Sequence, residues 1–128
     1  NPEDYQGWMM LGRSYTVLKK YPDAQKAYDK AIALKPKDVE PRRQLMASIM
    51  TTVNPDALAP YPKALGDVAA DILKIDANEP DALYVSGLVR AKAGDKAAAR
   101  GFWEKAQSAA PADWPFRADI TKRLSALD

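Results

Sequence analysis

The sequence predicts an all-α chain in which pairs of antiparallel helices stack side by side and a last amphipathic helix closes the stack. Apolar residues recur with the spacing of one helix face along most of the 128 residues. Proline, glycine and aspartate interrupt this pattern at intervals, where helices are expected to begin and end. A set of large and small residues returns at the same spacing in two places, which indicates an internal repeat.

The first repeat covers residues 5–38. Its opening segment is Trp8-Met9-Met10-Leu11-Gly12-Arg13-Ser14-Tyr15, with the spacing W-x-x-L-G-x-x-Y, and Ala24, Tyr28, Ala31 and Pro36 follow it. This is the signature of the tetratricopeptide repeat, a helical hairpin of about 34 residues. Small residues such as Gly12 let the two helices approach closely, and the large side chains of Trp8 and Tyr28 fill the space between turns. We therefore expect Trp8 in the core.

The last repeat covers residues 80–113. Leu83, Gly87 and Trp103 stand at signature positions, and Trp103 is expected in the core. Arg90 stands where the repeat normally has tyrosine. Two interpretations remain open. The arginine stem packs while its charge reaches the surface, which we favour, or the residue marks a widened contact for a bound partner.

The remaining segments complete the predicted stack. Residues 39–79 form an irregular repeat with an enlarged loop at 51–62, which contains prolines at 55, 60 and 62. Residues 115–127 form an amphipathic capping helix. Trp114 is either a brace beside this helix, which we favour, or an exposed anchor. The expected fold is a single domain, a right-handed tetratricopeptide solenoid of three helical hairpins plus this C-terminal capping helix.

The residue types argue against catalysis. The chain has no cysteine and no histidine, which removes thiol nucleophiles, disulfides, imidazole bases and the usual zinc ligands. Asp67 and Asp71 are one helical turn apart, but without a third ligand nearby we expect a solvated helix face. The net charge of +2 is spread along the chain, which disfavours nucleic-acid binding. We predict no enzyme activity, no metal site and no cofactor.

The predicted binding surface is a concave groove lined by the first helix of each hairpin. The groove residues are Gln6, Met9, Arg13, Thr16, Arg43, Ala47, Met50, Tyr84, Leu88 and Ala91, with Glu40 and Asp81 in the same register. An amphipathic partner helix would place its apolar face on the methionine, leucine and tyrosine side chains, and the arginines would bind its carboxylates. The alternative is that the apolar members belong to the core and the arginines are ordinary solvated charges.

A narrower resemblance covers nearly the whole chain. It rests on segments in the first, second and last repeats and in the cap. These are Leu11 through Ala24, Val53-Asn54-Pro55-Asp56-Ala57, Ala93-Gly94-Asp95, Phe102-Trp103, and Pro111-Ala112-Asp113-Trp114-Pro115-Phe116-Arg117 leading to Ile120 and Leu124. These segments resemble the periplasmic tetratricopeptide domain of the CcmI family of cytochrome c biogenesis proteins and its relative NrfG. The Pro-Phe-Arg segment is the most specific of them, because generic tetratricopeptide arrays do not share it.

The resemblance implies a role in cytochrome c maturation. In that family the domain is periplasmic and is tethered through a membrane segment absent from this chain, which opens inside a motif and is expected to come from a longer protein. The domain captures the C-terminal helix of apocytochrome c and presents it, with other subunits of the haem ligation complex, for covalent haem attachment. Haem itself is not its main ligand. The alternative is a structural scaffold for oligomerisation or for assembly of a membrane complex.

Overall fold

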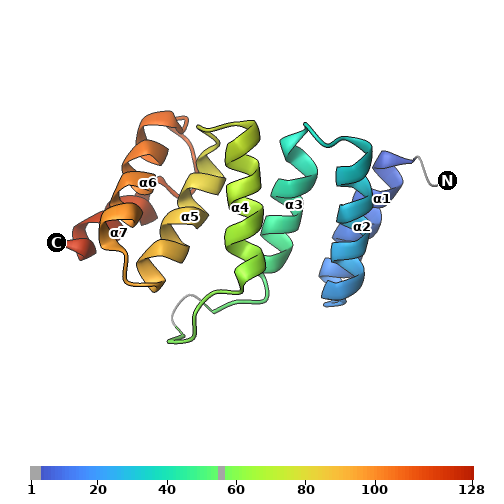
Figure 1. Cartoon of the computed structure of the whole chain (residues 1–128), viewed down its shortest axis with the longest axis horizontal. Coiled ribbons are helices and arrows are strands. Elements are labelled where there is room, and N and C mark those ends of the chain that lie inside the picture. The colour runs from blue at the N-terminus through green and yellow to red at the C-terminus, as the bar shows by residue number, and fades with distance from the viewer. Residues whose placement is uncertain (1–3, 55–56) are drawn as a thin grey trace. The chain divides into compact units, whose positions relative to one another are not determined.

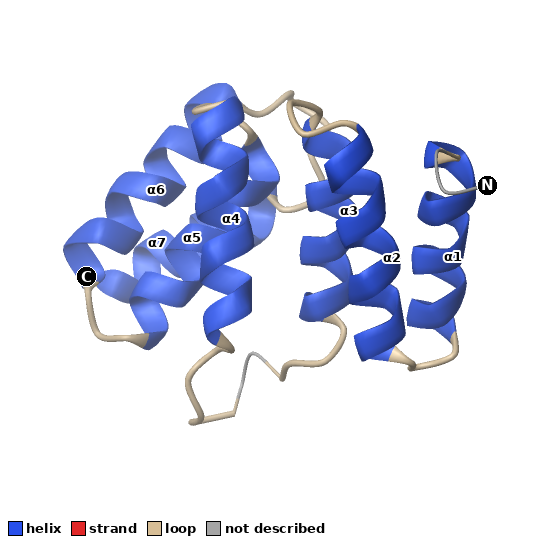
Figure 2. Ribbon diagram, turned by 45° about the vertical axis from the view of Figure 1, so that its right-hand side comes forward, coloured by secondary structure: helices blue, strands red, loops and turns tan. Residues whose placement is uncertain are grey.

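Seven α-helices make up most of the chain in the computed structural model, which describes residues 4–54 and 57–128 (Figure 2). They are α1 (Tyr5–Val17), α2 (Tyr21–Leu34), α3 (Val39–Met50), α4 (Lys63–Ile75), α5 (Pro80–Lys92), α6 (Lys96–Ala109) and α7 (Arg117–Leu127) (Figure 1). No strand occurs among the described residues. The all-α prediction is therefore confirmed. The helices group into two compact units, residues 1–57 with α1–α3 and residues 58–128 with α4–α7.

In the first unit, α1 and α2 form a hairpin and α3 packs against both helices. Helix α2 buries three alanines and Tyr28, and α3 buries long apolar residues. These buried residues are Ala24, Ala27, Tyr28, Ala31, Leu45 and Met46. Tyr28 packs directly over Gly12 of α1, where an added Cβ would lie 2.5 Å from the ring. The small residue is therefore what lets α1 and α2 lie close enough to enclose the tyrosine.

In the second unit, α5 packs against α4 on one side and α6 on the other, and α7 packs on α6. Trp103 of α6 is 2 % exposed and its indole Nε1–H donates to the Tyr84 carbonyl at 3.1 Å. The ring lies against Gly87 of α5, the same arrangement as Tyr28 on Gly12. The repeat signature predicted that Tyr28 and Trp103 fill the space between helices, and both are buried.

The turn between α5 and α6 has a glycine and an aspartate at its two critical positions. Gly94 has a φ of +89°, a left-handed conformation that glycine adopts without strain. The Asp95 side chain then accepts a hydrogen bond from the Ala98 N–H at 3.1 Å and caps α6. The connection between α3 and α4 spans residues 51–62, as predicted for the enlarged loop, although Pro55 lies outside the described residues.

The last helix begins at Arg117 and not at 115, because residues 111–116 form successive turns. The Arg117 guanidinium links the start of this helix to the end of α6. It donates to the carbonyls of Gln107 (3.2 Å), Ala110 (2.6 Å) and Pro111 (3.0 Å) at the end of α6. A cation at the C-terminal end of α6 stabilises the helix terminus and attaches the capping segment to it.

Candidate functional site

The predicted groove residues of the first unit lie on α1 and α3. Gln6, Arg13 and Ala47 are exposed, and Arg43 and Met50 are half-buried. Because α1 and α3 pack against each other, these two helices can present their side chains to one partner. Met9, in contrast, is only 3 % exposed and contributes to the packing of the unit. Its side chain is not available at the surface.

A hydrogen bond between side chains joins α1 to α3. The Thr16 and Ser48 hydroxyl oxygens are 2.8 Å apart, and the Thr16 hydroxyl also lies 2.9 Å from the Gly12 carbonyl, to which it can donate. Ser48 is buried, so this pairing satisfies a polar group that would otherwise be costly to bury. Thr16 therefore positions the two helices and is not the free groove contact that its spacing suggested.

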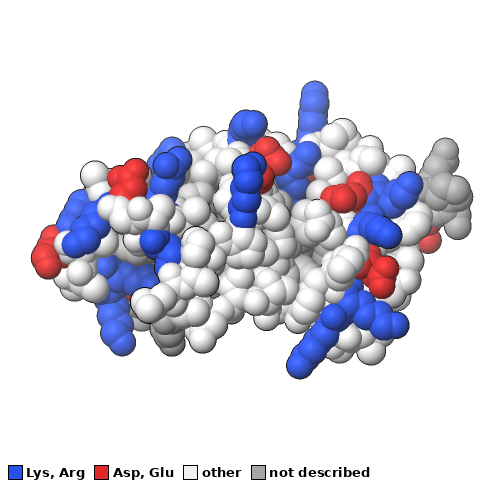
Figure 3. Space-filling model, turned by 60° about the horizontal axis from the view of Figure 1, so that its bottom comes forward, with Lys and Arg blue, Asp and Glu red and all other residues white. Residues whose placement is uncertain are grey.

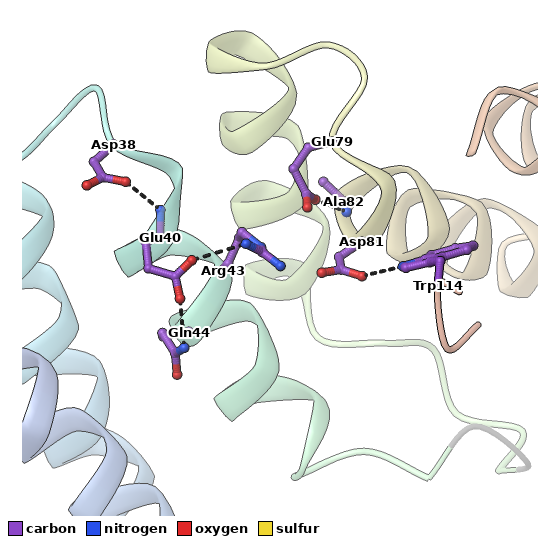
Figure 4. A network of polar contacts seen from close by, with 8 residues as sticks. All are labelled: Asp38, Glu40, Arg43, Gln44, Glu79, Asp81, Ala82 and Trp114. Carbon is purple, nitrogen blue, oxygen red and sulfur yellow. Dashed lines mark hydrogen bonds and ion pairs between the residues drawn. The ribbon is translucent and has the colours of Figure 1, made fainter. Parts of the chain in front are cut away.

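Arg43 is held in place on α3 by its neighbour Glu40 (Figure 4). Arg43 donates to the Glu40 carboxylate at 3.1 Å, and Gln44 donates to the other oxygen of that carboxylate at 2.9 Å. At the start of the helix, Asp38 accepts from the Glu40 N–H at 3.0 Å. The Arg43 side chain remains 40 % exposed, so a partner carboxylate can reach it beside or in place of Glu40.

In the second unit, the capping segment covers the predicted groove residue Tyr84. The Phe116 ring stacks on Tyr84 with centroids 4.7 Å apart, and the Trp114 ring meets it edge-on at 6.0 Å. The Tyr84 hydroxyl donates to Asp119 of α7 at 2.5 Å. Tyr84 and Leu88 are both buried, whereas Ala91 is half-buried. Tyr84 therefore fastens the cap to α5.

The tyrosine and the aspartate change each other's acidity. Burial, together with the hydrogen bond to the Asp119 carboxylate and its charge, raises the pKa of Tyr84 to about 12. Burial alone would raise the pKa of Asp119. Hydrogen bonds from Tyr84 and Arg123, with the charge of the arginine at 2.7 Å, outweigh burial and lower that pKa overall. The neutral tyrosine and the ionised aspartate are thus the stable pair at neutral pH.

Trp114 braces the cap, as predicted. Its indole N–H donates to the Asp81 carboxylate at 2.9 Å (Figure 4), and the residue is 8 % exposed. Sequence reasoning did not assign roles to Asp81, Phe116 or Asp119 in this contact. The only sequence signal was the unusual Trp-Pro-Phe-Arg run, which showed that the cap was specific without showing what it touched.

The two candidate carboxylates of α4 each pair with a lysine. Asp67 pairs with Lys63 at 2.9 Å and Asp71 with Lys74 at 3.7 Å, all four on the exposed side of α4. This is the solvated helix face that the spacing predicted. No cluster of metal-ligating side chains occurs among the described residues, and no helix among them is both long and apolar enough for a membrane span.

Arg90 extends its charged end into solvent, as the favoured interpretation predicted. Its guanidinium lies 3.9 Å from Asp95 and its side chain is 56 % exposed. Elsewhere, too, charges of both signs are interspersed. On the face shown in Figure 3, Lys and Arg side chains stand singly or in small groups with Asp and Glu among them. Such a surface is unlike the continuous basic track of a nucleic-acid interface.

The prediction that Trp8 belongs to the core is wrong: it is only half-buried. It lies with Leu11 and Met10 beside a shallow hollow of about 410 Å³ on α1. Met10, Leu11 and Leu18 expose 61 %, 42 % and 62 % of their surface. The physical reason is that α1 buries only Met9 and Gly12, so the packed stripe is narrow and the side chains next to it are not fully covered. This face of α1 is therefore an exposed apolar patch.

Solved structures share this arrangement of helices. MamA aligns over 99 % of this chain and 63 % of its own, with a TM-score of 0.78 and 19 % identity. PcrH, solved in complex with the chaperone binding region of PopD, aligns over 95 % of this chain and 89 % of its own, with a TM-score of 0.74 and 20 % identity. The first TPR of Spaghetti (RPAP3), solved with the HSP90 peptide SRMEEVD, aligns over 99 % of this chain and 92 % of its own, with a TM-score of 0.73 and 13 % identity. The chain is thus an all-α protein of the tetratricopeptide class.

Within that class the sequence is more specific. Residues 1–117 match the family described as the cytochrome c-type biogenesis protein H TPR domain, and the chain belongs to this family. The cytochrome c-type biogenesis protein CycH of Pseudomonas aeruginosa is 32 % identical over 119 residues, 93 % of this chain and 28 % of that protein. CycH of Bradyrhizobium diazoefficiens is 29 % identical over 128 residues, which cover 97 % of this chain and 32 % of that protein. The chain therefore spans about three tenths of the length of these relatives.

Proposed function

We propose that this domain binds protein clients during cytochrome c maturation. In this proposal it captures the C-terminal helix of apocytochrome c and holds it for covalent haem attachment, together with other subunits of the haem ligation complex. The observation that carries the proposal is membership of the cytochrome c biogenesis family over residues 1–117. A periplasmic location and a place in the CcmI and NrfG group belong to the same proposal, supported by the Trp114-Pro115-Phe116-Arg117 segment.

The fold supports a role in binding polypeptides. Among the structural neighbours, PcrH holds a region of PopD and RPAP3 holds a short HSP90 peptide. Tetratricopeptide stacks of this size can therefore accommodate a segment of another protein. Transferred to this chain, the same use of the fold would suit a client helix.

The proposed contact surface in the first unit is the α1–α3 face, defined by Gln6, Arg13, Arg43, Ala47 and Met50. Met50 is half-buried and adapts its shape to an apolar side chain of the client. Arg13 and Arg43 would bind acidic side chains or a terminal carboxylate of the client, since guanidinium binds carboxylate through paired hydrogen bonds. In the second unit, half-buried Ala91 is the groove residue that remains accessible.

The decisive test is calorimetry with a synthetic peptide from the C-terminal helix of an apocytochrome c. We expect a Kd in the micromolar range, about −8 kcal/mol. Arg43→Glu should weaken binding about tenfold, because it removes a cation and places a second anion beside Glu40. The matched control is Lys30→Glu, the same charge reversal at an exposed position of α2.

Thermal melts followed by circular dichroism must show both variants folded, so that weaker binding reports on the contact surface and not on stability. Equal affinity for Arg43→Glu and Lys30→Glu would remove Arg43 from the site. Failure of several apocytochrome peptides to bind the unmodified domain would overturn the proposed function.

A second candidate function, a scaffold for assembly, is favoured by the exposed apolar face of α1. Contiguous exposed apolar side chains mark contact surfaces more often than isolated ones do. If a second copy covers this face, sedimentation equilibrium should show dimers at high concentration. A Leu11→Lys, Leu18→Lys double variant should then be monomeric, while Leu34→Lys on α2 should still associate. A native chain that sediments as a monomer throughout would exclude this candidate.

A further inference from the structure

A second hollow lies within the second unit, away from the predicted groove residues. It is a cleft of about 390 Å³ over α5, between α4 and α6. Its lining is Tyr61, Pro62, Lys63, Gly66, Asp67, Ala70, Leu73, Ser86, Val89, Arg90, Ala93 and Phe102. Every one of these residues belongs to residues 58–128, so the cleft is complete within one compact unit.

The cleft lies where the repeat signature is broken, at Arg90. In the first repeat the equivalent residue is Tyr15, which is half-buried. At Arg90 the side chain instead extends outward, with more than half of its surface exposed. Ser86 and Val89, on the same helix, line the cleft beside Arg90.

Helix α4 does not fill the cleft. Two of the residues it places on the cleft are Gly66 and Ala70, which have the smallest side chains available. A Cβ added at Gly66 would meet only Val89, at an ordinary contact distance of 3.6 Å. Leu73 and Phe102 form the apolar walls. The cleft therefore has an apolar floor and the volume for a large side chain.

Cations outnumber anions around the cleft. Lys63 and Arg90 line it, and Lys92 lies over the ring of Tyr61 at 5.3 Å. The acidic neighbours are Asp67 and Asp95, paired with Lys63 at 2.9 Å and Arg90 at 3.9 Å. Both ion pairs are largely exposed to solvent, and exposed ion pairs contribute little to stability. Arg90 in particular lies beyond hydrogen-bond distance of Asp95, so its donors can turn to an incoming carboxylate.

We propose that this cleft, which we call the Arg90 cleft, docks a segment of a partner protein in which a large apolar side chain stands next to acidic side chains. The apolar side chain enters above Ser86 and Val89, and a carboxylate of the segment pairs with Arg90 and Lys63. The site is additional to the α1–α3 face and does not depend on the client proposed for that face.

The test uses nuclear magnetic resonance on the uniformly ¹⁵N-labelled chain. The probe is a peptide capped at both ends, with Leu-Phe at its centre and three glutamates on each side. A second peptide has the same sequence with lysines in place of the glutamates. A third peptide has glutamines there and a free C-terminus, which separates side-chain carboxylates from a terminal one. We expect saturable shifts of amides in 63–73 and 86–93 with the first peptide only, with a Kd of about 1 mM or tighter.

Two variants decide whether the cleft itself is the site. Ala70→Leu fills the hollow from an exposed position and should weaken binding at least tenfold, whereas Ala64→Leu, exposed on the same helix but outside the cleft, should not. Arg90→Tyr restores the signature ring and should abolish binding. If that variant is unfolded, Ala70→Leu alone decides.

Shifts that map to α1 and α3, equal binding of the lysine peptide, or unchanged affinity of Ala70→Leu would each overturn the proposal. So would no binding by any of the three peptides. Shifts caused only by the glutamine peptide would replace side-chain acids with a terminal carboxylate and would overturn the proposal as stated.

Discussion

Gly87→Ala should lower the free energy of unfolding by about 2 kcal/mol, even though alanine is the better helix former. A Cβ at Gly87 would lie 2.1 Å from the Trp103 indole nitrogen and 2.4 and 2.6 Å from two ring carbons. Contacts this short force the ring or the helices to move. Overpacking a core in this way costs about 1–3 kcal/mol and occasionally more, and the gain in helix propensity offsets up to about 1 kcal/mol.

The tryptophan cannot move away cheaply. Its side chain is 2 % exposed, and its N–H is held by the Tyr84 carbonyl at 3.1 Å. A displaced ring would leave that carbonyl without its side-chain donor and would open space beside Ala99 and Ala106, which are fully buried on the same helix. The expected loss therefore combines strain with a broken hydrogen bond.

Urea denaturation followed by circular dichroism measures the effect. Gly101→Ala is the matched control, because nothing lies within 4 Å of a Cβ at that position of α6. It should stabilise the chain by about 0.5–1 kcal/mol. Equal stability changes for the two alanine variants would show that the close approach of α5 and α6 is not needed for stability.

The contact between α5 and α6 could be predicted because the spacing of the repeat signature specifies it. Gly87 and Trp103 stand at signature positions that meet in every such hairpin, as do Gly12 and Tyr28. The loop at 51–62 was also visible, since prolines interrupt the helical pattern there. Local chemistry and a fixed hairpin geometry together determined these features.

Trp8 shows where that approach fails. The signature predicts a large residue at this position but not what covers it, and in the first repeat the face of α1 that carries Trp8, Leu11 and Leu18 remains exposed. Burial at this position requires a neighbouring element on that side. Periodicity along one helix contains no information about such an element.

The contact of Tyr84 with the cap could not be predicted for a related reason. Its spacing on α5 predicted a groove position, but the chain folds back after α6 and places Phe116 and Asp119 over it. Whether an exposed stripe faces a client or the chain's own terminus depends on the path of a loop. The sequence showed an unusual Trp-Pro-Phe-Arg run and left the direction of that path open.

Raising the pH from 10 to 12 should lower the free energy of unfolding through the contact between Tyr84 and the cap. The pKa of Tyr84 is raised from its ordinary value of 10 to about 12 in the folded chain. Below pH 10 the tyrosine is neutral in both the folded and the unfolded states, so its contribution to stability is complete. Above pH 10 the unfolded chain releases the proton first, and stability falls by up to about 1.4 kcal/mol per pH unit until the folded tyrosine ionises as well. The total loss is about 2–3 kcal/mol.

Tyr84→Phe isolates this contribution from the other groups that titrate in the same range. The variant keeps the ring that stacks on Phe116 and loses the hydrogen bond to Asp119. At pH 8 it should be less stable than the native chain by about 1.5 kcal/mol, because a hydrogen bond to a charged group is lost. As the pH rises toward 12 the native chain loses its advantage, and the two unfolding free energies should converge or cross.

Asp119→Asn provides the matched control for the cause of the shift. Asparagine keeps an oxygen that can accept from Tyr84 but removes the negative charge that helps hold the tyrosine neutral. Its loss of stability between pH 10 and 12 should therefore be smaller than that of the native chain, measured by urea denaturation at each pH. If native and Tyr84→Phe curves instead remain parallel from pH 8 to 12, the hydroxyl does not titrate with folding. The Tyr84–Asp119 bond would then not be what fastens the cap to α5.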